Sequence, residues 1–144
     1  MDTLLTDELW NSIVLFLPEH VPSPKGGRRR VPDKDCLRGI LFVLREGIRW
    51  QSLPKEMGCG SGSTCWRRFQ EWTAAGVWHK SHCHLAATLG ERGLLNLERI
   101  VADSASCRAH AGGEHTGPNP TDRAKSGTAI HLATEEHGLP LGER

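Results

Sequence analysis

The sequence predicts an α+β protein in which a helical, helix-turn-helix-like region, residues 1–95, precedes a region built on strands, residues 96–144. Apolar residues recur at helical spacing between residues 6 and 90. After Leu97 the pattern changes to short apolar runs bounded by turn residues, which is typical of strands. Stretches rich in Gly and Pro separate these segments and predict loops.

The first two helices are predicted from their ends. Thr6 can cap the first helix, and Pro18 follows its end. Asp33 can cap the second helix, which is expected to run to about Arg45, and Gly47 can end it in a left-handed conformation. The apolar face of the first helix comprises Leu9, Trp10, Ile13, Val14, Phe16 and Leu17. Cys36 lies within the apolar pattern of the second helix and is predicted to be a core residue.

A third and a fourth helix are predicted over residues 63–75 and 77–90, with Gly76 as the break between them. The buried side of the third helix is predicted to hold the aromatic residues Trp66, Phe69 and Trp72. Arg67 and Arg68 lie off that side and are expected to point outward.

The strand region is predicted to begin with residues 97–102, which lead directly into Asp103. Residues 110–127 are rich in Gly, Pro, Asn, Thr and Ser and predict a loop. A hairpin is expected over residues 128–141, with its turn at residues 135–138. A strand, a loop and a hairpin in this order indicate the opening of a mixed α/β domain.

The net charge of +1 conceals an uneven distribution of charge along the chain. Residues 1–20 carry −4, residues 21–80 carry +7 and residues 81–144 carry −2. A concentrated positive segment is typical of a protein that binds nucleic acid. A solvated basic surface without a partner is the alternative, and charge alone does not separate the two.

The composition argues against membrane-spanning and disulfide-stabilised classes of protein. No apolar run is long enough to span a bilayer, and the acidic N-terminus does not resemble a secretory signal, so a cytoplasmic protein is expected. Five cysteines, an odd number, do not suggest a disulfide framework. The histidines and the cysteine of residues 79–84 could suggest zinc, but their spacing matches no paired motif, and a helix with polar surface histidines is the favoured interpretation.

Three helices with outward arginines on the third match a helix-turn-helix layout. Such a helix can lie in a DNA groove, while the arginines of residues 28–30 contact phosphates. The alternative is a helical bundle with ordinary surface arginines. The residues predicted to contact DNA are Arg28, Arg29, Arg30, Thr64, Arg67, Arg68, Lys80 and Arg108.

Asp103 follows a short apolar run and precedes small polar residues and a basic segment. This arrangement suits a carboxylate that binds one of two metal ions acting on a phosphodiester. The alternative is a turn residue that accepts hydrogen bonds from nearby backbone. Glu135 and Glu136 are predicted at a hairpin tip and are not counted as further metal ligands. Because such a site needs several carboxylates, the chain is interpreted as the front half of a DNA-processing enzyme.

Five ordered segments resemble a bacterial insertion-sequence transposase of the DDE class, and together they extend over nearly the whole chain. They begin with Leu5–Trp10, Gly39–Trp50, Gly58–Cys59 followed by Thr64–Phe69, Asp103–Ser104 and Thr116–Arg123. The resemblance implies an N-terminal DNA-recognition domain, followed by the truncated beginning of an RNase H-like catalytic domain. It also implies Mg²⁺-dependent cutting at terminal inverted repeats, with Asp103 as the first catalytic acid and a metal ligand.

The sequence departs from the family pattern in two places. Ala105 stands where the family often has Thr or Ser after the Asp-Ser pair. The second Asp and the Glu of the triad should lie well beyond residue 144. Members of the family are often encoded in two overlapping frames, so a downstream-frame segment is an expected partner, together with DNA and further copies of the chain. The alternatives are an inactive DNA-binding regulator and a truncated remnant.

Overall fold

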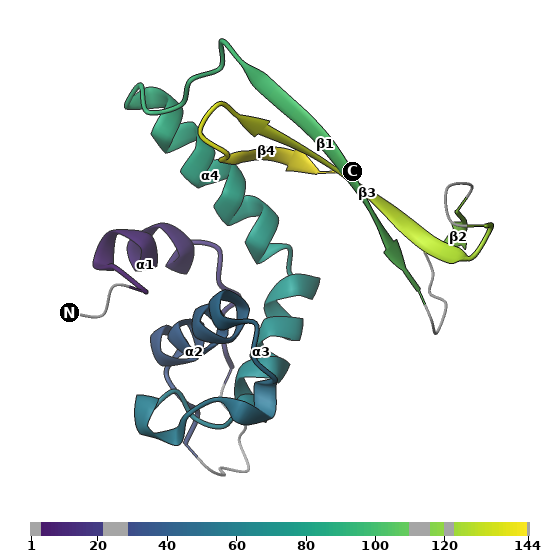
Figure 1. Cartoon of the computed structure of the whole chain (residues 1–144). Coiled ribbons are helices and arrows are strands. Elements are labelled where there is room, and N and C mark those ends of the chain that lie inside the picture. Colours follow the sequence, from purple (N-terminus) through teal and green to yellow (C-terminus); the bar gives the residue numbers. More distant parts are fainter. Residues whose placement is uncertain (1–3, 22–28, 110–115, 120–122, 144) are drawn as a thin grey trace. The chain divides into compact units, whose positions relative to one another are not determined.

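The computed structural model (Figure 1) describes residues 4–21, 29–109, 116–119 and 123–143. Within these residues, four α-helices come first and an antiparallel sheet follows, so the predicted α+β class is confirmed. The chain divides into two compact units, Met1–Leu85 and Ala86–Arg144. We describe each unit separately. The roles assigned to residues 1–95 and 96–144 stay predictions.

The first two helices are α1 (Asp7–Val14) and α2 (Asp33–Glu46). The predicted cap of α1 is confirmed, because Thr6 Oγ1 accepts a hydrogen bond of 3.2 Å from the Leu9 N–H. The predicted stop of α2 is also confirmed, since Gly47 adopts a φ of 62°. The predicted cap at Asp33 is wrong: Pro32 occupies the cap position, and the Asp33 carboxylate is instead engaged by Arg68 of another helix.

The remaining helices are two short 3₁₀ turns, η1 (Trp50–Ser52) and η2 (Lys55–Met57), then α3 (Gly62–Ala74) and α4 (Val77–Glu91). Gly76, with a φ of 69°, lies between α3 and α4 as predicted. The start of α3 packs directly on η1. A Cβ atom on Gly62 would lie 1.7 Å from the Trp50 carbonyl oxygen, so this approach requires glycine.

The core of the helical unit is formed by α1, α2, α3, the segment that joins α2 to α3, and the start of α4. Its buried apolar residues are Leu5, Ile13, Cys36, Leu37, Ile40, Val43, Leu53, Cys59, Cys65, Trp72 and Val77. The core position predicted for Cys36 is therefore confirmed. The predicted buried side of α3 is only partly correct, because Trp72 is fully buried, Phe69 is partly buried and Trp66 is 42% exposed.

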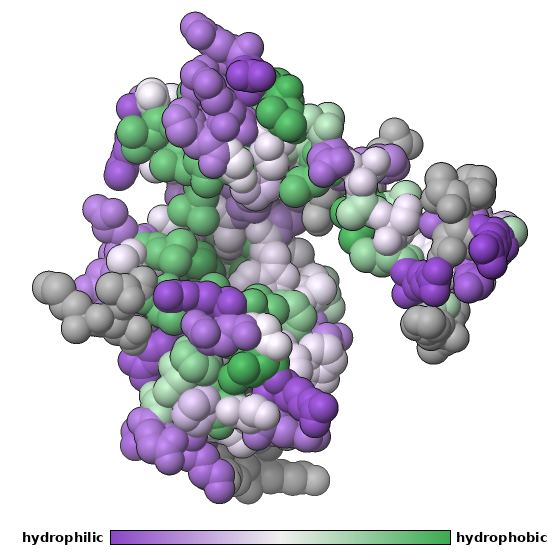
Figure 2. Space-filling model, in the orientation of Figure 1, coloured by the Kyte–Doolittle hydropathy of each residue, from purple (hydrophilic) through white to green (hydrophobic). Residues whose placement is uncertain are grey.

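The actual buried stripe of α3 comprises Cys65, Arg68 and Trp72, so the helix is rotated relative to the prediction. Trp66 instead packs at the surface against Trp50, with ring centroids 5.2 Å apart, and against Phe69, at 5.9 Å. Aliphatic residues such as Leu15 and Leu44 are also exposed, and hydrophobic residues (green) are visible on the face drawn in Figure 2.

The sheet unit contains β1 (Ile100–Arg108), β2 (Gly117–Pro118), β3 (Ser126–Glu135) and β4 (Pro140–Glu143). β1 pairs antiparallel with β3, and β2 and β4 also pair with β3. The predicted hairpin is present, with Gly138 at a φ of 87° in its turn. The predicted loop at residues 110–127 contains β2 and the start of β3, and its residues 110–115 and 120–122 lie outside the described part of the chain.

The predicted end of the first strand at Asp103 is wrong. β1 begins at Ile100 and continues beyond Asp103 to Arg108, because β3 is long enough to pair with all of it. Asp103 faces Leu132 in this register, and Ala105 faces Ile130. Directly opposed residues share one face of an antiparallel sheet, so Asp103 lies on an apolar face. Every residue of β1 is exposed.

Candidate nucleic-acid interface

A surface pocket of about 510 Å³ lies beside the N-terminus of α3. It is lined by Arg29, Arg30, Val31, Gly60, Ser61, Thr64, Arg67, Arg68 and Glu71. Five of the eight residues predicted to contact DNA are among them. The fold therefore brings the arginines before α2 next to the polar first turns of α3, although more than 30 residues separate them in the sequence.

The first turn of α3 contributes polar groups to this pocket. Ser61 caps the helix, and its Oγ accepts a hydrogen bond of 3.2 Å from the Thr64 N–H. The hydroxyls of Ser61 and Thr64 lie 2.9 Å apart. The N-terminus of a helix carries a partial positive charge and favours anions. Hydroxyls, a helix N-terminus and arginines thus converge on one pocket, which suits a phosphate.

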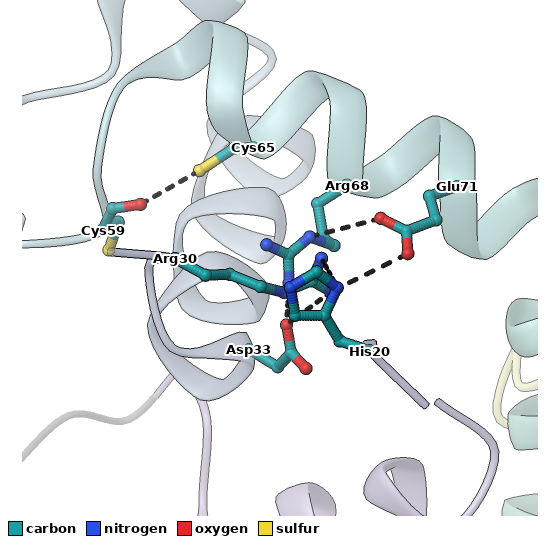
Figure 3. A network of polar contacts seen from close by, with 7 residues as sticks. All are labelled: His20, Arg30, Asp33, Cys59, Cys65, Arg68 and Glu71. Carbon is teal, nitrogen blue, oxygen red and sulfur yellow. Dashed lines mark hydrogen bonds and ion pairs between the residues drawn. The ribbon is translucent and has the colours of Figure 1, made fainter. Parts of the chain in front are cut away.

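Four charged side chains form a network (Figure 3), and three of them, Arg30, Arg68 and Glu71, line the pocket. Asp33 accepts from Arg68 and, at 3.4 Å, from Arg30. Glu71 pairs with Arg68 at 3.5 Å and with Arg30 at 3.7 Å. Arg30 also donates to His20 Nδ1 at 3.1 Å, since a guanidinium can only donate. The network ties the start of α2 to the middle of α3.

The outward position predicted for Arg68 is wrong. Its side chain is only 6% exposed, and its guanidinium lies 5.8 Å from the centre of the Trp72 ring. Burial and the charge of Arg30 lower the pKa of Arg68, while Glu71 raises it. Asp33 and Trp72 hold the side chain inward by an ion pair and a cation–π contact. Arg67 is exposed, as predicted.

The inner network balances its own charge, because Arg30 and Arg68 face the two carboxylates of Asp33 and Glu71. Among the residues that line the pocket, Arg29 and Arg67 supply the positive charge in excess. Both are exposed. The sequence analysis missed the two acids. The spacing of Arg68 and Glu71 at i and i+3 is the signal that could have found the second of them.

The other predicted DNA contacts lie elsewhere. Arg28 falls outside the described residues. Lys80 Nζ donates to the Ala75 carbonyl at 3.3 Å, just beyond the last residue of α3. Arg108 ends β1 in the sheet unit and lines a separate pocket of about 350 Å³ with Ala109, Lys125 and Ser126.

Asp103 lies in the middle of β1, where its Oδ1 accepts a hydrogen bond of 2.7 Å from the Ser104 N–H. In the described part of the chain, no group of three or more His, Cys, Asp or Glu side chains is arranged to hold a metal ion. The Mg²⁺ site that the resemblance implies requires the carboxylates of a complete enzyme and stays a prediction. In the segment considered for zinc, His79 Nε2 lies 3.7 Å from Cys83 Sγ.

The family described as "Putative transposase of IS4/5 family (DUF4096)" matches residues 5–82. The chain belongs to this family. The match contains α1, α2, α3 and every residue that lines the pocket at the N-terminus of α3. Membership of this IS4/5 family confirms the resemblance to an insertion-sequence transposase at the level of the family.

Relatives from insertion elements agree with this assignment. The chain is 45% identical over 119 residues to "Insertion element IS402 uncharacterized 16.2 kDa protein" of Burkholderia cepacia, with 81% of each chain covered. It is 41% identical over 51 residues to "Putative transposase for insertion sequence element IS402" of the same organism, which is 35% of this chain and 22% of the relative. No solved structure matches.

A third relative is "Uncharacterized protein y4sN" of Sinorhizobium fredii (strain NBRC 101917 / NGR234). It is 29% identical over 106 residues, 74% of this chain and 77% of the relative. The family match and the two IS402 relatives together identify the chain as a transposase-associated protein of an insertion element. Within the described residues, no helix has the length and apolar character needed to cross a bilayer.

Proposed function

We propose that this IS4/5-family protein is the DNA-recognition part of a transposase and binds the terminal inverted repeats of its element. The observation that carries the proposal is the pocket at the N-terminus of α3, where Arg29 and Arg67 remain exposed after the inner arginines are paired. Family membership supports it, since a transposase must recognise the ends of its element. DNA binding would place the protein on the nucleoid in the cytoplasm.

The chemistry of the proposed contact follows from the pocket. A DNA phosphate beside Ser61 would meet the N–H groups at the start of α3 and the guanidinium of Arg29. Arg30 pairs with Asp33 and Glu71, so the excess positive charge beside the phosphate would come from Arg29 and Arg67. Contacts of this kind release counterions, and binding weakens steeply as salt rises.

Fluorescence anisotropy with the full chain and a labelled duplex of the element's terminal repeat tests the proposal. We expect Arg29→Ala and Arg67→Ala each to lower the slope of log affinity against log salt by about 1, because each removes one phosphate contact or cation. Arg45→Ala is the matched control, since Arg45 lies outside the pocket and pairs with the adjacent Glu46. Equal slopes for all four proteins would contradict the proposal.

Catalysis belongs to a second and separate proposal. We propose that the Mg²⁺-dependent strand cleavage and transfer of a DDE, RNase H-like enzyme require a longer product, in which a downstream-frame segment adds the missing carboxylates to Asp103. The chain alone would then act as a DNA-binding regulator that occupies the repeats, as a homo-oligomer if it pairs the two ends. The proposal that cleavage requires a longer product would be overturned if the 144-residue protein nicked supercoiled plasmid with Mg²⁺ and Asp103→Asn abolished the nicking.

A further inference from the structure

Helix α3 presents three different faces along its length. Cys65 and Trp72 enter the core, and Arg68 with Glu71 forms the inner wall of the pocket. Ser63, Arg67 and Gln70 are all exposed, at i, i+4 and i+7, and so form one outward stripe. The stripe lies opposite the buried side of the helix.

The ion-pair network keeps this outward stripe free of negative charge. Glu71 is the one acid in α3, and its carboxylate is drawn toward Arg30 and Arg68 at 3.7 and 3.5 Å (Figure 3). An acid on the stripe would repel the phosphates that flank a DNA groove. The same contacts fix the rotation of α3 about its axis, so Arg67 and Gln70 are held at a constant angle to the pocket.

We infer that Arg67 and Gln70 read base edges of duplex DNA in the major groove, while Arg29 and the start of α3 hold a flanking phosphate. An α-helix fits this groove, in which arginine pairs with guanine and glutamine with adenine through two hydrogen bonds each. The inference rests on the proposed DNA-binding function and adds to it the residues that determine specificity.

The spacing of the two residues predicts the form of the DNA site. Arg67 and Gln70 are three residues apart, which is about 4.5 Å along a helix axis. One step between base pairs is about 3.4 Å. The two side chains therefore address base pairs that are neighbours or next neighbours, and the site should contain a G·C pair and an A·T pair at that separation.

Selection from a library of duplexes with a randomised segment of about 20 base pairs, using the full chain, tests the inference. Arg67→Lys keeps the charge but loses the planar pair of donors, so we expect it to lose the preference for guanine. Gln70→Ala should lose the preference for adenine. Each should lower the affinity ratio between the selected duplex and a scrambled duplex by roughly 5- to 100-fold. Arg29→Ala should select the same sequence with a smaller salt slope.

The outcomes separate the inference from the function on which it rests. If the wild-type chain binds no duplex, the proposed function fails. If it binds but selects no sequence, or if Arg67→Lys and Gln70→Ala select the wild-type sequence, the inference alone is overturned. Both positions are exposed, so the variants should fold, and an unchanged tryptophan emission spectrum of each purified variant checks this.

Discussion

Different interactions stabilise the helical unit and the sheet unit of this chain. In the helical unit, α2 and α3 interlock around side chains such as Leu37, Ile40 and Trp72, which are fully buried. In the sheet unit, all nine residues of β1 are exposed, and order comes from backbone pairing with β3. The comparison teaches that a regular ladder can exist where side-chain burial is nearly absent.

The exposed side chains of the sheet unit are not random in kind. Val101 is 49% exposed, Ile130 43% and Leu132 39%, and the register places all three on the face that carries Asp103. A small sheet without a covered apolar face is marginally stable in water. The sheet unit is therefore expected to be the less stable of the two.

The largest expected effect contrasts two isoleucines, one from each unit. Ile40→Ala removes a fully buried side chain from α2 and should cost about 2–5 kcal/mol of unfolding free energy, from lost burial and the cavity that remains. Ile130→Ala should cost about 0.5 kcal/mol, since its side chain already contacts water. Urea unfolding followed by fluorescence reports the helical unit, because all five tryptophans lie in residues 10–78.

Hydrogen exchange of the β1 and β3 amides measures the effect of Ile130→Ala in the sheet unit. A loss of protection as large as that caused in the helical unit by Ile40→Ala would break the comparison. It would show that the face of Val101, Ile130 and Leu132 is covered in solution, by another copy of the chain or by a longer product.

Local signals in the sequence predicted the ends of elements in the helical unit. A cap such as Thr6 and a stop such as Gly47 act within one turn of the chain, so neighbouring residues are enough to identify them. The rotation of α3 was not predictable in this way. Hydrophobicity favours burying Trp66, whereas the fold buries Arg68, because Asp33 and Glu71 neutralise it.

Long-range pairing explains the other differences. Aspartate is a residue type that favours caps, but the Asp33 carboxylate pairs with Arg68, 35 residues away in the sequence, as well as with Arg30. No local pattern reveals the pairing with Arg68. Likewise the end of β1 depends on the length of β3, not on the residues after Asp103. Four of the arginines predicted to contact DNA line one pocket, where Arg30 and Arg68 are paired and Arg29 and Arg67 are exposed. Their contact with DNA stays a prediction.

The close contact between α3 and η1 provides a second test. Gly62→Ala should destabilise the helical unit by about 1–3 kcal/mol, because the added Cβ would overlap the Trp50 carbonyl, which is backbone and moves little. Gln70→Ala in the same helix is the control, since Gln70 is exposed and a surface substitution changes stability by about 0.5 kcal/mol at most. Equal changes for the two variants in urea unfolding would contradict the packing.

A smaller effect is expected at the N-terminus of α1. Thr6→Ala removes the acceptor for the Leu9 N–H and should cost about 1 kcal/mol in the same unfolding measurement. Thr6→Ser keeps a hydroxyl at the cap and should restore most of that loss. If serine were no better than alanine, the hydrogen bond would not be the source of the stability.

The smallest change should come from pH and should appear in the sheet unit alone. The buried carboxylate of Glu135 accepts from the Leu139 and His137 N–H groups, at 3.0 and 2.7 Å, and lies 3.1 Å from His137 Nδ1. The Leu139 N–H, followed by His137, lowers the pKa of Glu135, and Glu135 raises the pKa of His137.

Glu135 therefore stabilises the β3–β4 turn above its unfolded pKa and loses this effect as pH falls through its lowered native value. His137 stabilises the turn below its unfolded pKa and loses the effect as pH rises through its raised native value. Protection of the Leu139 amide, corrected for intrinsic exchange, should be greatest between about pH 4.3 and 6.5, the ordinary values of the two groups. Glu135→Gln should flatten this profile while fluorescence-detected unfolding of the helical unit stays unchanged. A shift in that unfolding would instead link the turn to the helical unit and remove the basis for treating the two as separate.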